Sequence, residues 1–471
     1  MTSAVVEYLD EGKPTAGFAS GEDRTFFGHP RGLAYLAFTE AWERFSFYGM
    51  AALLLLYMIQ HLLTPAVMGG VLGLGVFRTA LESIVGPLSD RAFASQINGL
   101  YLGLVYFTPV FGGLLADRLL GQRRTVMLGA VMIAFGHVLM AFEASFLIAL
   151  ALLIAGSGCL KGNISTQVGH LYPPADESRR TRAFAIFSAS INIGAFTGPL
   201  ICGLVAQRWG WHAGFGLAGT MMLVALAIYV KGWQYLPPDA RRARGAAAPP
   251  LDRRDWAAVA VLILITVISV PAAIAYFQGV NAGLIFIEES VRRQVFGWEV
   301  PTSTFVALDG LWCFTLVPPL IMLWKWQERR GHEPGELGKM SIGYLLTAMG
   351  SLLMVMPAMW TDVDPTAKVS IVWPLMFSLL NGVGFLFYWP TQLALFSRAA
   401  PRAINATMMG ILFLSPFAGA VLGGAVGGYW DRISHAEFYA FHAVLAGASL
   451  LAMLLIARPA ARILAPRSGM V

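Results

Sequence analysis

The chain has 471 residues, of which 57% are hydrophobic and only 13% are charged. Soluble globular domains carry about 25% charged residues, so the composition excludes an ordinary soluble protein and indicates one embedded in lipid. The formal net charge of +6 does not indicate nucleic-acid binding, because the basic residues lie in short loops between apolar segments and not on one face of a soluble module.

The three cysteines, Cys159, Cys202 and Cys313, each lie within an apolar stretch, where cysteine behaves as a small hydrophobe. None has a partner at metal-ligand spacing, so we expect no disulfide, no metal and no cofactor. Residues 1–30 are polar and lack the charged start and short apolar core of a signal peptide, which predicts an N-terminal segment that stays in the cytoplasm.

Apolar segments long enough to cross a membrane recur along the chain. A bilayer core of about 30 Å needs about 20 apolar helical residues, and twelve segments meet this condition, which predicts an all-α membrane protein with 12 transmembrane helices. Their approximate limits are 33–62, 97–116, 125–142, 146–168, 183–206, 213–236, 256–287, 304–326, 341–360, 370–397, 405–429 and 437–457. The seventh is overlong and contains Pro271, so we expect a kink or a first half that lies on the membrane surface.

Basic residues indicate the orientation, since Arg and Lys accumulate on the cytoplasmic side of membrane proteins. They follow every even-numbered span: Arg118, Arg123 and Arg124; Arg179, Arg180 and Arg182; Arg241, Arg242, Arg244, Arg253 and Arg254; Lys325, Arg329 and Arg330; Arg398 and Arg402; Arg458, Arg462 and Arg467. Both termini are therefore predicted to be cytoplasmic.

A segment rich in proline, alanine, glycine and arginine, 237–255, separates six spans from six and predicts a cytoplasmic linker between two six-helix bundles. The bundles are then 31–236 and 256–458, and residues 459–471 form a cytoplasmic tail. The loop 63–96 is unusually long, and its moderately apolar part predicts a periplasmic hairpin or an interfacial helix.

A pair of glycines at the end of the second span precedes an aspartate and several arginines. Small residues let helices approach closely, and an aspartate beside arginines can form a charge latch that breaks when two bundles move. Topology alone would explain the arginines, but the whole motif resembles the signature of the major facilitator superfamily. The resemblance implies the major facilitator fold and assigns gating to Gly113, Asp117, Arg118, Arg123 and Arg124.

The first span contains Glu40, Glu43 and Arg44. Charged residues within a span cost several kcal/mol unless they pair, so they indicate function, and these three share one helical face because positions i, i+3 and i+4 are neighbours. A protonatable carboxylate beside an arginine is either ion-paired or neutral with the arginine released, which is what proton coupling needs. The alternative is a salt bridge that only holds the bundle together.

Together with the following Phe45, an aromatic pair ending in Tyr48, and a glycine, these residues resemble the helix 1 signature of the proton-dependent oligopeptide transporters (POT family). The resemblance implies a proton role for both glutamates. It also implies that Arg44 is shared between Glu43 and the substrate, and that Tyr48 lies at the binding site.

Three further residues of the first bundle are candidates for substrate binding. A lone lysine deep in a span, Lys161, indicates function; the resemblance implies that it attracts the substrate carboxylate, and a static bridge to Glu43 is the alternative. Asn192 matches a family position but could equally form only an interhelical hydrogen bond. Tyr106 matches a pocket tyrosine of the family, with packing as the alternative.

The second bundle departs from the family pattern. The family's aromatic, glutamate, glutamine run in the seventh span reads Tyr276, Phe277, Gln278, and in the tenth span Phe385 replaces another family glutamate, followed by Trp389. Without these glutamates the site loses its strongest attraction for an ammonium group, while the aromatic rings leave cation–π attraction and apolar area. We expect Phe277, Gln278, Phe385 and Trp389 to line the substrate site.

One acid is gained in exchange, because Asp309 in the eighth span stands where the family has an asparagine. If it faces the cavity, it can serve as the ammonium partner or as a proton site. The alternative is a solvated, inert position near the periplasmic end of its helix.

The sequence predicts a transporter and not an enzyme: a proton-coupled symporter that imports small peptides or peptide-derived compounds with a carboxylate across the bacterial inner membrane. The alternative substrate is an anionic metabolite without a free amine, bound by Arg44 and Lys161. The expected partners are the substrate, protons and membrane lipids, without nucleic acid. A monomer is compatible with the sequence, which leaves the oligomeric state open.

Overall fold

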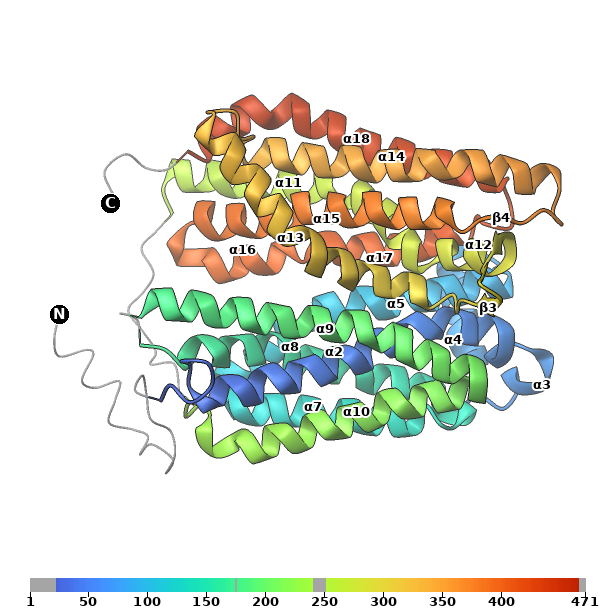
Figure 1. Cartoon of the computed structure of the whole chain (residues 1–471), viewed down its shortest axis with the longest axis horizontal. Coiled ribbons are helices and arrows are strands. Elements are labelled where there is room, and N and C mark those ends of the chain that lie inside the picture. Colours follow the sequence, from blue (N-terminus) through green and yellow to red (C-terminus); the bar gives the residue numbers. More distant parts are fainter. Residues whose placement is uncertain (1–22, 174–175, 240–250, 466–471) are drawn as a thin grey trace. The chain divides into compact units, whose positions relative to one another are not determined.

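The computed structural model of the chain describes residues 23–173, 176–239 and 251–465 and is mostly helical (Figure 1). The chain divides into two compact units. Unit 1 comprises Met1–Met50, Gly70–Leu72 and Thr108–Ala246, and unit 2 comprises Ala51–Gly69, Gly73–Phe107 and Ala247–Val471. The predicted linker and both predicted cytoplasmic ends lie partly outside the described residues, and the predicted bundle limits stay a prediction.

Unit 1 is built from long helices and short connections. Its helices are α2 (Arg31–Tyr57, up to Met50), α6 (Pro109–Leu115), α7 (Gln122–Leu139), α8 (Phe146–His170), α9 (Glu177–Trp209) and α10 (Trp211–Gly232). A π-helical turn, Ala116–Leu120, extends α6, and short 3-10 turns precede α8 and follow α10. Within the unit, α8 packs on α6 and α7, and α10 packs on α7 and α9.

Unit 2 contains the remaining helices and four two-residue strands. The helices are the end of α2, α3 (Pro65–Met68), α4 (Leu74–Val85), α5 (Asp90–Phe107), α11 (Arg253–Phe277), α12 (Ala282–Ser290), α13 (Thr304–Arg329), α14 (Glu336–Val363), α15 (Val372–Ala399), α16 (Asn405–Leu412), α17 (Leu414–Gly427) and α18 (His435–Ile463). The strands are β1 (Val291–Arg292), β2 (Gln294–Val295), β3 (Trp298–Glu299) and β4 (Val369–Ser370). They form a parallel β1–β4 pair and an antiparallel β2–β3 pair.

Local sequence explains several helix ends. Asp252 before α11 and Ser434 before α18 each form a capping box with the acid three residues later, which satisfies backbone N–H groups that have no partner inside the helix. Pro65 and Pro109 occupy the first positions of α3 and α6, where the missing N–H group of proline costs nothing.

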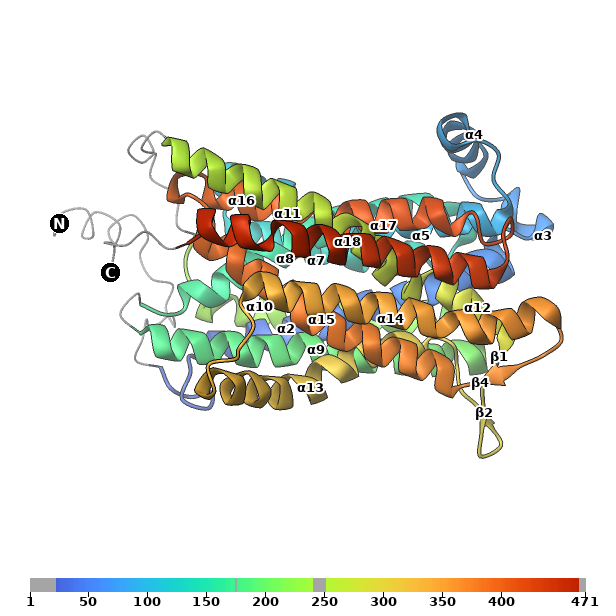
Figure 2. The ribbon, with the colours of Figure 1, turned by 90° about the horizontal axis from the view of Figure 1, so that it is seen from above.

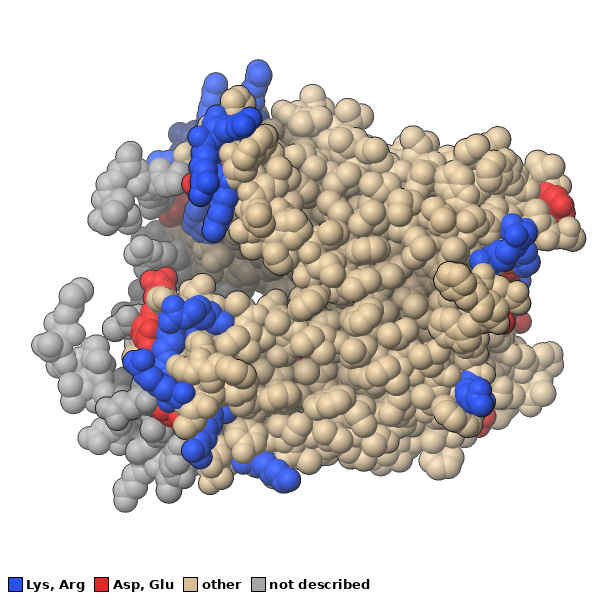
Figure 3. All heavy atoms as spheres, viewed as in Figure 1, with Lys and Arg blue, Asp and Glu red and all other residues tan. Residues whose placement is uncertain are grey.

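The all-α membrane fold is confirmed. Eleven helical segments among the described residues are long and apolar enough to cross a membrane, and they correspond to eleven of the twelve predicted spans. The predicted third span corresponds to α7 (Gln122–Leu139), whose first turn contains Arg123 and Arg124 and which is not among the eleven, so this third span stays a prediction. Figure 3 shows Lys and Arg gathered mainly at one end of each unit, beside a broad surface without charged residues.

The helix of the predicted seventh span is interrupted after Pro271 and not at it. Helix α11 continues through Pro271 to Phe277 and is interrupted only by the 3-10 turn Gln278–Val280 before α12 begins. The N–H group of Ala272 donates to the Ser449 hydroxyl at 3.0 Å, which gives it a partner outside its own helix. One face of the first half of α11 packs into the core of unit 2 through Ala258, Leu262 and Ile265, so the alternative of a first half that lies on the membrane surface was wrong.

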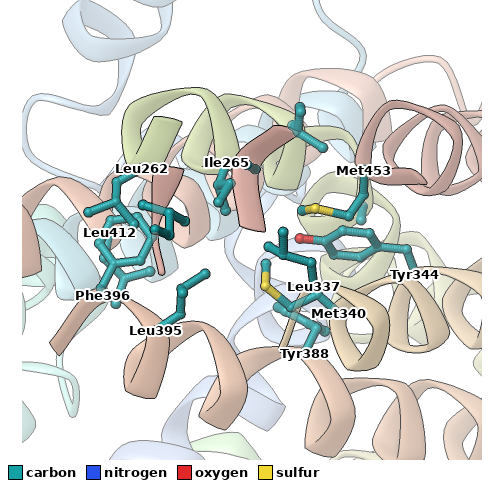
Figure 4. Packing of buried hydrophobic residues seen from close by; sticks show 14 of the residues in the cluster. Leu262, Ile265, Leu337, Met340, Tyr344, Tyr388, Leu395, Phe396, Leu412 and Met453 are labelled. Carbon is teal, nitrogen blue, oxygen red and sulfur yellow. The ribbon is translucent and has the colours of Figure 1, made fainter. Parts of the chain in front are cut away.

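An apolar cluster in unit 2 joins α11, α14, α15, α16 and α18 (Figure 4). Leu262 and Ile265 of α11, Tyr344 of α14 and Met453 of α18 are fully buried in it. The Tyr344 hydroxyl lies 2.7 Å from the Ser269 hydroxyl, so the one polar atom that this ring brings into the cluster has a partner. Burial of side chains from five elements gives unit 2 a packed core of its own.

Glycines let the helices of unit 1 approach to backbone contact. A Cβ atom added at Gly112 of α6 would lie 2.1 Å from the carbonyl oxygen of Gly158 in α8, whereas one added at the next residue, Gly113, would meet no atom within 4 Å. The hydrophobic effect drives helix packing in water but not within lipid, where helices associate through the close contacts that small residues allow. Of the two glycines in the motif, Gly112 therefore carries the helix contact.

We predict that Gly112→Ala lowers the unfolding temperature of the purified protein, because the added methyl group forces α6 away from α8 at a cost of about 1–3 kcal/mol. The matched control is Gly113→Ala, which adds the same atom to open space and should leave the unfolding temperature unchanged. Thermal unfolding in detergent measures both. Equal unfolding temperatures for the two variants would contradict the packing role of Gly112.

Candidate functional site

A charged cluster lies inside α2. The Arg44 Nε atom is 2.9 Å from Glu40 Oε1 and 2.6 Å from Glu43 Oε2. All three residues are buried. The i, i+3, i+4 spacing therefore places both carboxylates on the same guanidinium, as the sequence predicts.

Close packing of α9 holds this stretch of α2 in place. A Cβ atom added at Gly194 would lie 2.4 Å from the Ala41 carbonyl oxygen, and one added at Gly198 would lie 2.3 Å from the Phe45 carbonyl oxygen. The two backbones therefore touch on either side of Arg44. Asn192, half-buried on the same helix, belongs to this region of unit 1.

Phe47 joins Arg44 to Lys161. The Lys161 Nζ atom lies 4.2 Å from the centre of the Phe47 ring, and the Arg44 Cζ atom lies 5.6 Å from it. Both distances suit cation–π attraction. The site predicted from sequence does not include Phe47, although its position three residues after Arg44 places it on the same helical face. Tyr48 is half-buried and contacts Phe47 edge-on at 5.0 Å.

The cluster can couple the uptake of a proton to the binding of an anion. With Glu40 and Glu43 ionised, the formal charges of Arg44 and Lys161 balance them, which makes burial tolerable. Protonation of either glutamate leaves one unit of positive charge. In a medium of low dielectric this charge strongly attracts an anion such as a carboxylate.

The predicted gating residues separate into one buried arginine and an exposed set. The Arg123 side chain is buried and donates to the carbonyl oxygens of Pro237, at 2.6 Å, and Leu236. Its backbone N–H donates to Asp239 Oδ1 at 2.8 Å. Arg123 thus ties the start of α7 to the chain that follows α10. Asp117, Arg118 and Arg124 are exposed, and their gating role, like that of Gly113, stays a prediction.

Unit 2 contains a row of aromatic rings at the positions where the sequence departs from the family pattern. Tyr276 stacks on Phe385, with ring centres 5.3 Å apart, and Phe385 stacks on Trp389 at 6.3 Å. Phe277 contacts Tyr276 and Tyr106 edge-on. The two phenylalanines that stand in place of family glutamates therefore belong to one aromatic array, which we name the aromatic wall: Tyr106, Tyr276, Phe277, Phe385 and Trp389.

Asp309 is attached to this wall. The Tyr276 hydroxyl donates to Asp309 Oδ2 at 3.1 Å. Both residues line a small cavity of about 30 Å³, whose size suits about one water molecule. Asp309 is half-buried and hydrogen-bonded, which favours the cavity-facing alternative. The site predicted from sequence does not include Tyr276, although its place beside Phe277 indicates that it belongs there.

Gln278 is engaged with the backbone. Its amide group donates to the carbonyl oxygen of Gly423 at 3.0 Å and to that of Ile274 at 3.4 Å. Gln278 is buried in this position, so the geometry favours a packing role. Its role in substrate binding stays a prediction.

The chain has extensive similarity to known transporters. Residues 123–240 and 252–441 match the profile of PTR2, the POT family. An uncharacterised transporter of Bacillus subtilis, YclF, is 31% identical over 88% of this chain and 91% of its own length. The peptide transporter YePEPT of Yersinia enterocolitica is 30% identical over 86% and 89%, and a di-/tripeptide transporter of Lactococcus lactis is 29% identical over 93% and 97%.

Solved structures share the fold. A peptide transporter POT in complex with sulfate superposes with a TM-score of 0.80 at 25% identity, over 96% of this chain and 98% of that one. A POT family transporter in complex with 5-aminolevulinic acid gives a TM-score of 0.78 at 24% identity, over 96% and 100%. The relatives and structures named here are all transporters, which agrees with the expectation that this chain is not an enzyme.

We predict that Arg123→Lys destabilises the protein, because a lysine cannot hold two backbone carbonyl oxygens with one planar fork, and a buried carbonyl left without a donor costs about 1–3 kcal/mol. Arg124→Lys, at the exposed neighbouring position, is the matched control and should unfold like the wild type. Thermal unfolding in detergent compares them. An Arg123→Lys variant of unchanged stability would exclude the structural role.

Proposed function

Because the chain belongs to the POT family of transporters, we propose that it carries small peptides, or peptide-derived compounds that bear a carboxylate, into the cell together with protons. The proposal places it in the bacterial inner membrane with both termini in the cytoplasm. One observation carries the coupling: Arg44 lies between two buried carboxylates, at 2.9 and 2.6 Å.

Proton loading follows from this arrangement. A proton that binds Glu43 removes one negative charge from the pair that holds Arg44, so the guanidinium can turn to the carboxylate of an incoming substrate. Loss of the proton restores the ion pair and displaces the substrate. Binding of the two cargoes is thereby linked, since each favours the state in which Arg44 is released from Glu43.

Lys161 adds a second cation for the substrate carboxylate in this proposal. Its ammonium group lies 4.2 Å from the centre of the Phe47 ring, and the same ring contacts the Arg44 guanidinium, so the two cations lie close enough to attract one carboxylate together. The family resemblance of the sequence around Lys161 supports the same role.

For the substrate amine we propose Asp309. Its carboxylate accepts from Tyr276 and is set against the aromatic wall, where an ammonium group would find one negative charge and the faces of aromatic rings. A single carboxylate in unit 2 would then do the work of the glutamates that Phe277 and Phe385 replace.

A second candidate substrate is an anion without a free amine. The observation that favours it is the aromatic wall itself, because two rings stand where the family has carboxylates and offer mainly apolar area. The peptide transporters among the relatives favour the first candidate. The two candidates differ in one measurable property, the preference for a free over a blocked amine.

We predict that Glu43→Gln abolishes proton-driven accumulation while substrate exchange stays at least partly active, because a permanently neutral side chain cannot load and release a proton. Uptake under an imposed proton gradient and counterflow without one are compared in proteoliposomes.

The matched control for this test is Glu328→Gln at the exposed end of α13, which should accumulate substrate like the wild type. Concentrative uptake by Glu43→Gln at the wild-type level would show that Glu43 does not carry the coupled proton.

We predict that Asp309→Asn weakens binding of a free dipeptide more than binding of its acetylated form, because an ammonium group loses its charged partner and an amide does not need one. Phe385→Glu should shift the preference towards the free dipeptide. Binding of both ligands to purified protein measures the ratio.

If the wild type prefers the free dipeptide by a factor of about ten or more, equal to about 1.4 kcal/mol, and Asp309→Asn leaves that ratio unchanged, another group holds the amine. If the wild type does not distinguish the two ligands and Asp309→Asn has no effect on either, the amine-free substrate is favoured.

A further inference from the structure

Helix α4 (Leu74–Val85) is set apart from the spanning helices of unit 2. Figure 2 shows it beside the end of α5 and away from the packed helices of the unit. Glycines with positive φ bound it, 76° at Gly73 and 84° at Gly86, and residues with a Cβ atom rarely adopt such values. The backbone can therefore turn sharply at both ends of the helix.

One face of α4 is anchored to α5. The Phe77 ring lies 6.1 Å from the Phe93 ring, and the Arg78 guanidinium lies 5.1 Å from the same ring. Arg78 also donates to Asp90 Oδ1 at 2.8 Å, and Asp90 is the first residue of α5. These contacts hold α4 beside the first turn of α5, where the membrane-spanning segment Asp90–Leu120 begins.

The opposite face of α4 is apolar and exposed. Val76 and Ile84 keep 78% and 81% of their surface accessible. With Ala80 they form a stripe at four-residue spacing along one side of the helix, which we name the α4 stripe: Val76, Ala80 and Ile84. Thr79 and Ser83 flank it and are also exposed. A helix with an apolar face of this kind is typical of a membrane interface.

The charges of α4 are satisfied within the protein. Arg78 donates to Glu82 at 3.0 Å as well as to Asp90, and this hydrogen bond from Arg78 lowers the pKa of the Glu82 carboxyl. The helix contains no other charged residue. Its exposed face thus offers no charge for recognition of an acidic or basic protein partner.

We propose that the α4 stripe inserts into the lipid interface at the membrane surface and that its occupant is the bilayer. Arg78 ties α4 to Asp90, and the membrane-spanning segment Asp90–Leu120 begins at that residue, so the stripe lies at the end of a span. Burial of the stripe among acyl chains removes exposed aliphatic side chains from water. The flanking Thr79 and Ser83 hydroxyls donate to the carbonyl oxygens of Gly75 and Ala80, so neither brings an unpaired donor to this face. Because the exposed face carries no charge, anchoring does not require anionic lipid.

Site-directed spin labelling of the full-length protein in phosphatidylcholine vesicles tests this proposal. Nitroxides are attached to cysteines introduced at the α4 stripe in a variant without Cys159, Cys202 and Cys313. Accessibility to oxygen, which concentrates in lipid, and to a water-soluble nickel complex is then measured. Pro365→Cys in the exposed loop after α14 gives the aqueous reference, and Leu451→Cys on the exposed face of α18 gives the lipid reference.

Labels on the stripe should show an oxygen-to-nickel accessibility ratio several-fold above the ratio at Pro365 and close to the ratio at Leu451. The ratio should not change when phosphatidylglycerol is added. A ratio equal to that at Pro365 would show that the stripe faces water and would overturn the proposal. Labels shielded from both reagents would show that protein covers the stripe, which also overturns it. A ratio that rises only with phosphatidylglycerol would contradict charge-independent anchoring.

Discussion

The high cost of unpaired charge inside a membrane is the constraint on which the rest of this structure depends. Arg44 is tolerable within α2 because two carboxylates lie within 2.9 Å of its Nε atom, and Lys161 is placed over an aromatic ring. The same cost makes the arrangement responsive, since the charge balance changes by a full unit when one carboxylate takes up a proton.

Helix packing through glycine supports this charged cluster. The helices of unit 1 cannot rely on the hydrophobic effect within lipid, so they gain stability by close backbone contact, at Gly194 and Gly198 between α9 and α2 and at Gly112 between α6 and α8. A cluster whose function depends on distances of a few ångströms needs a rigid frame. Unit 1 provides one, to which the Arg123 side chain adds hydrogen bonds between the start of α7 and the chain that follows α10.

Unit 2 presents aromatic rings where unit 1 presents a cluster of charged side chains. Aromatic rings occupy the positions of two family glutamates and stack on one another, and one new acid, Asp309, is held by a tyrosine of the same array. Fewer charges in a buried region lower its desolvation cost. Under the proposed function, the expected consequence is a weaker dependence on the substrate amine, while Arg44 and Lys161 of unit 1 are proposed to bind the carboxylate.

The sequence by itself determined the all-α membrane fold, the family, and the grouping of Glu40, Glu43 and Arg44, because hydropathy and the spacing of residues along one helix are local properties. Only the tertiary structure decided which distant residues meet: Phe47 with Lys161, Asp309 with Tyr276, and Arg123 with the carbonyl oxygens of Leu236 and Pro237. It also placed the interruption of the seventh span at Gln278–Val280 and not at Pro271. Such pairings depend on the rotation and depth of each helix against its neighbours, which side-chain packing sets and local sequence patterns do not specify.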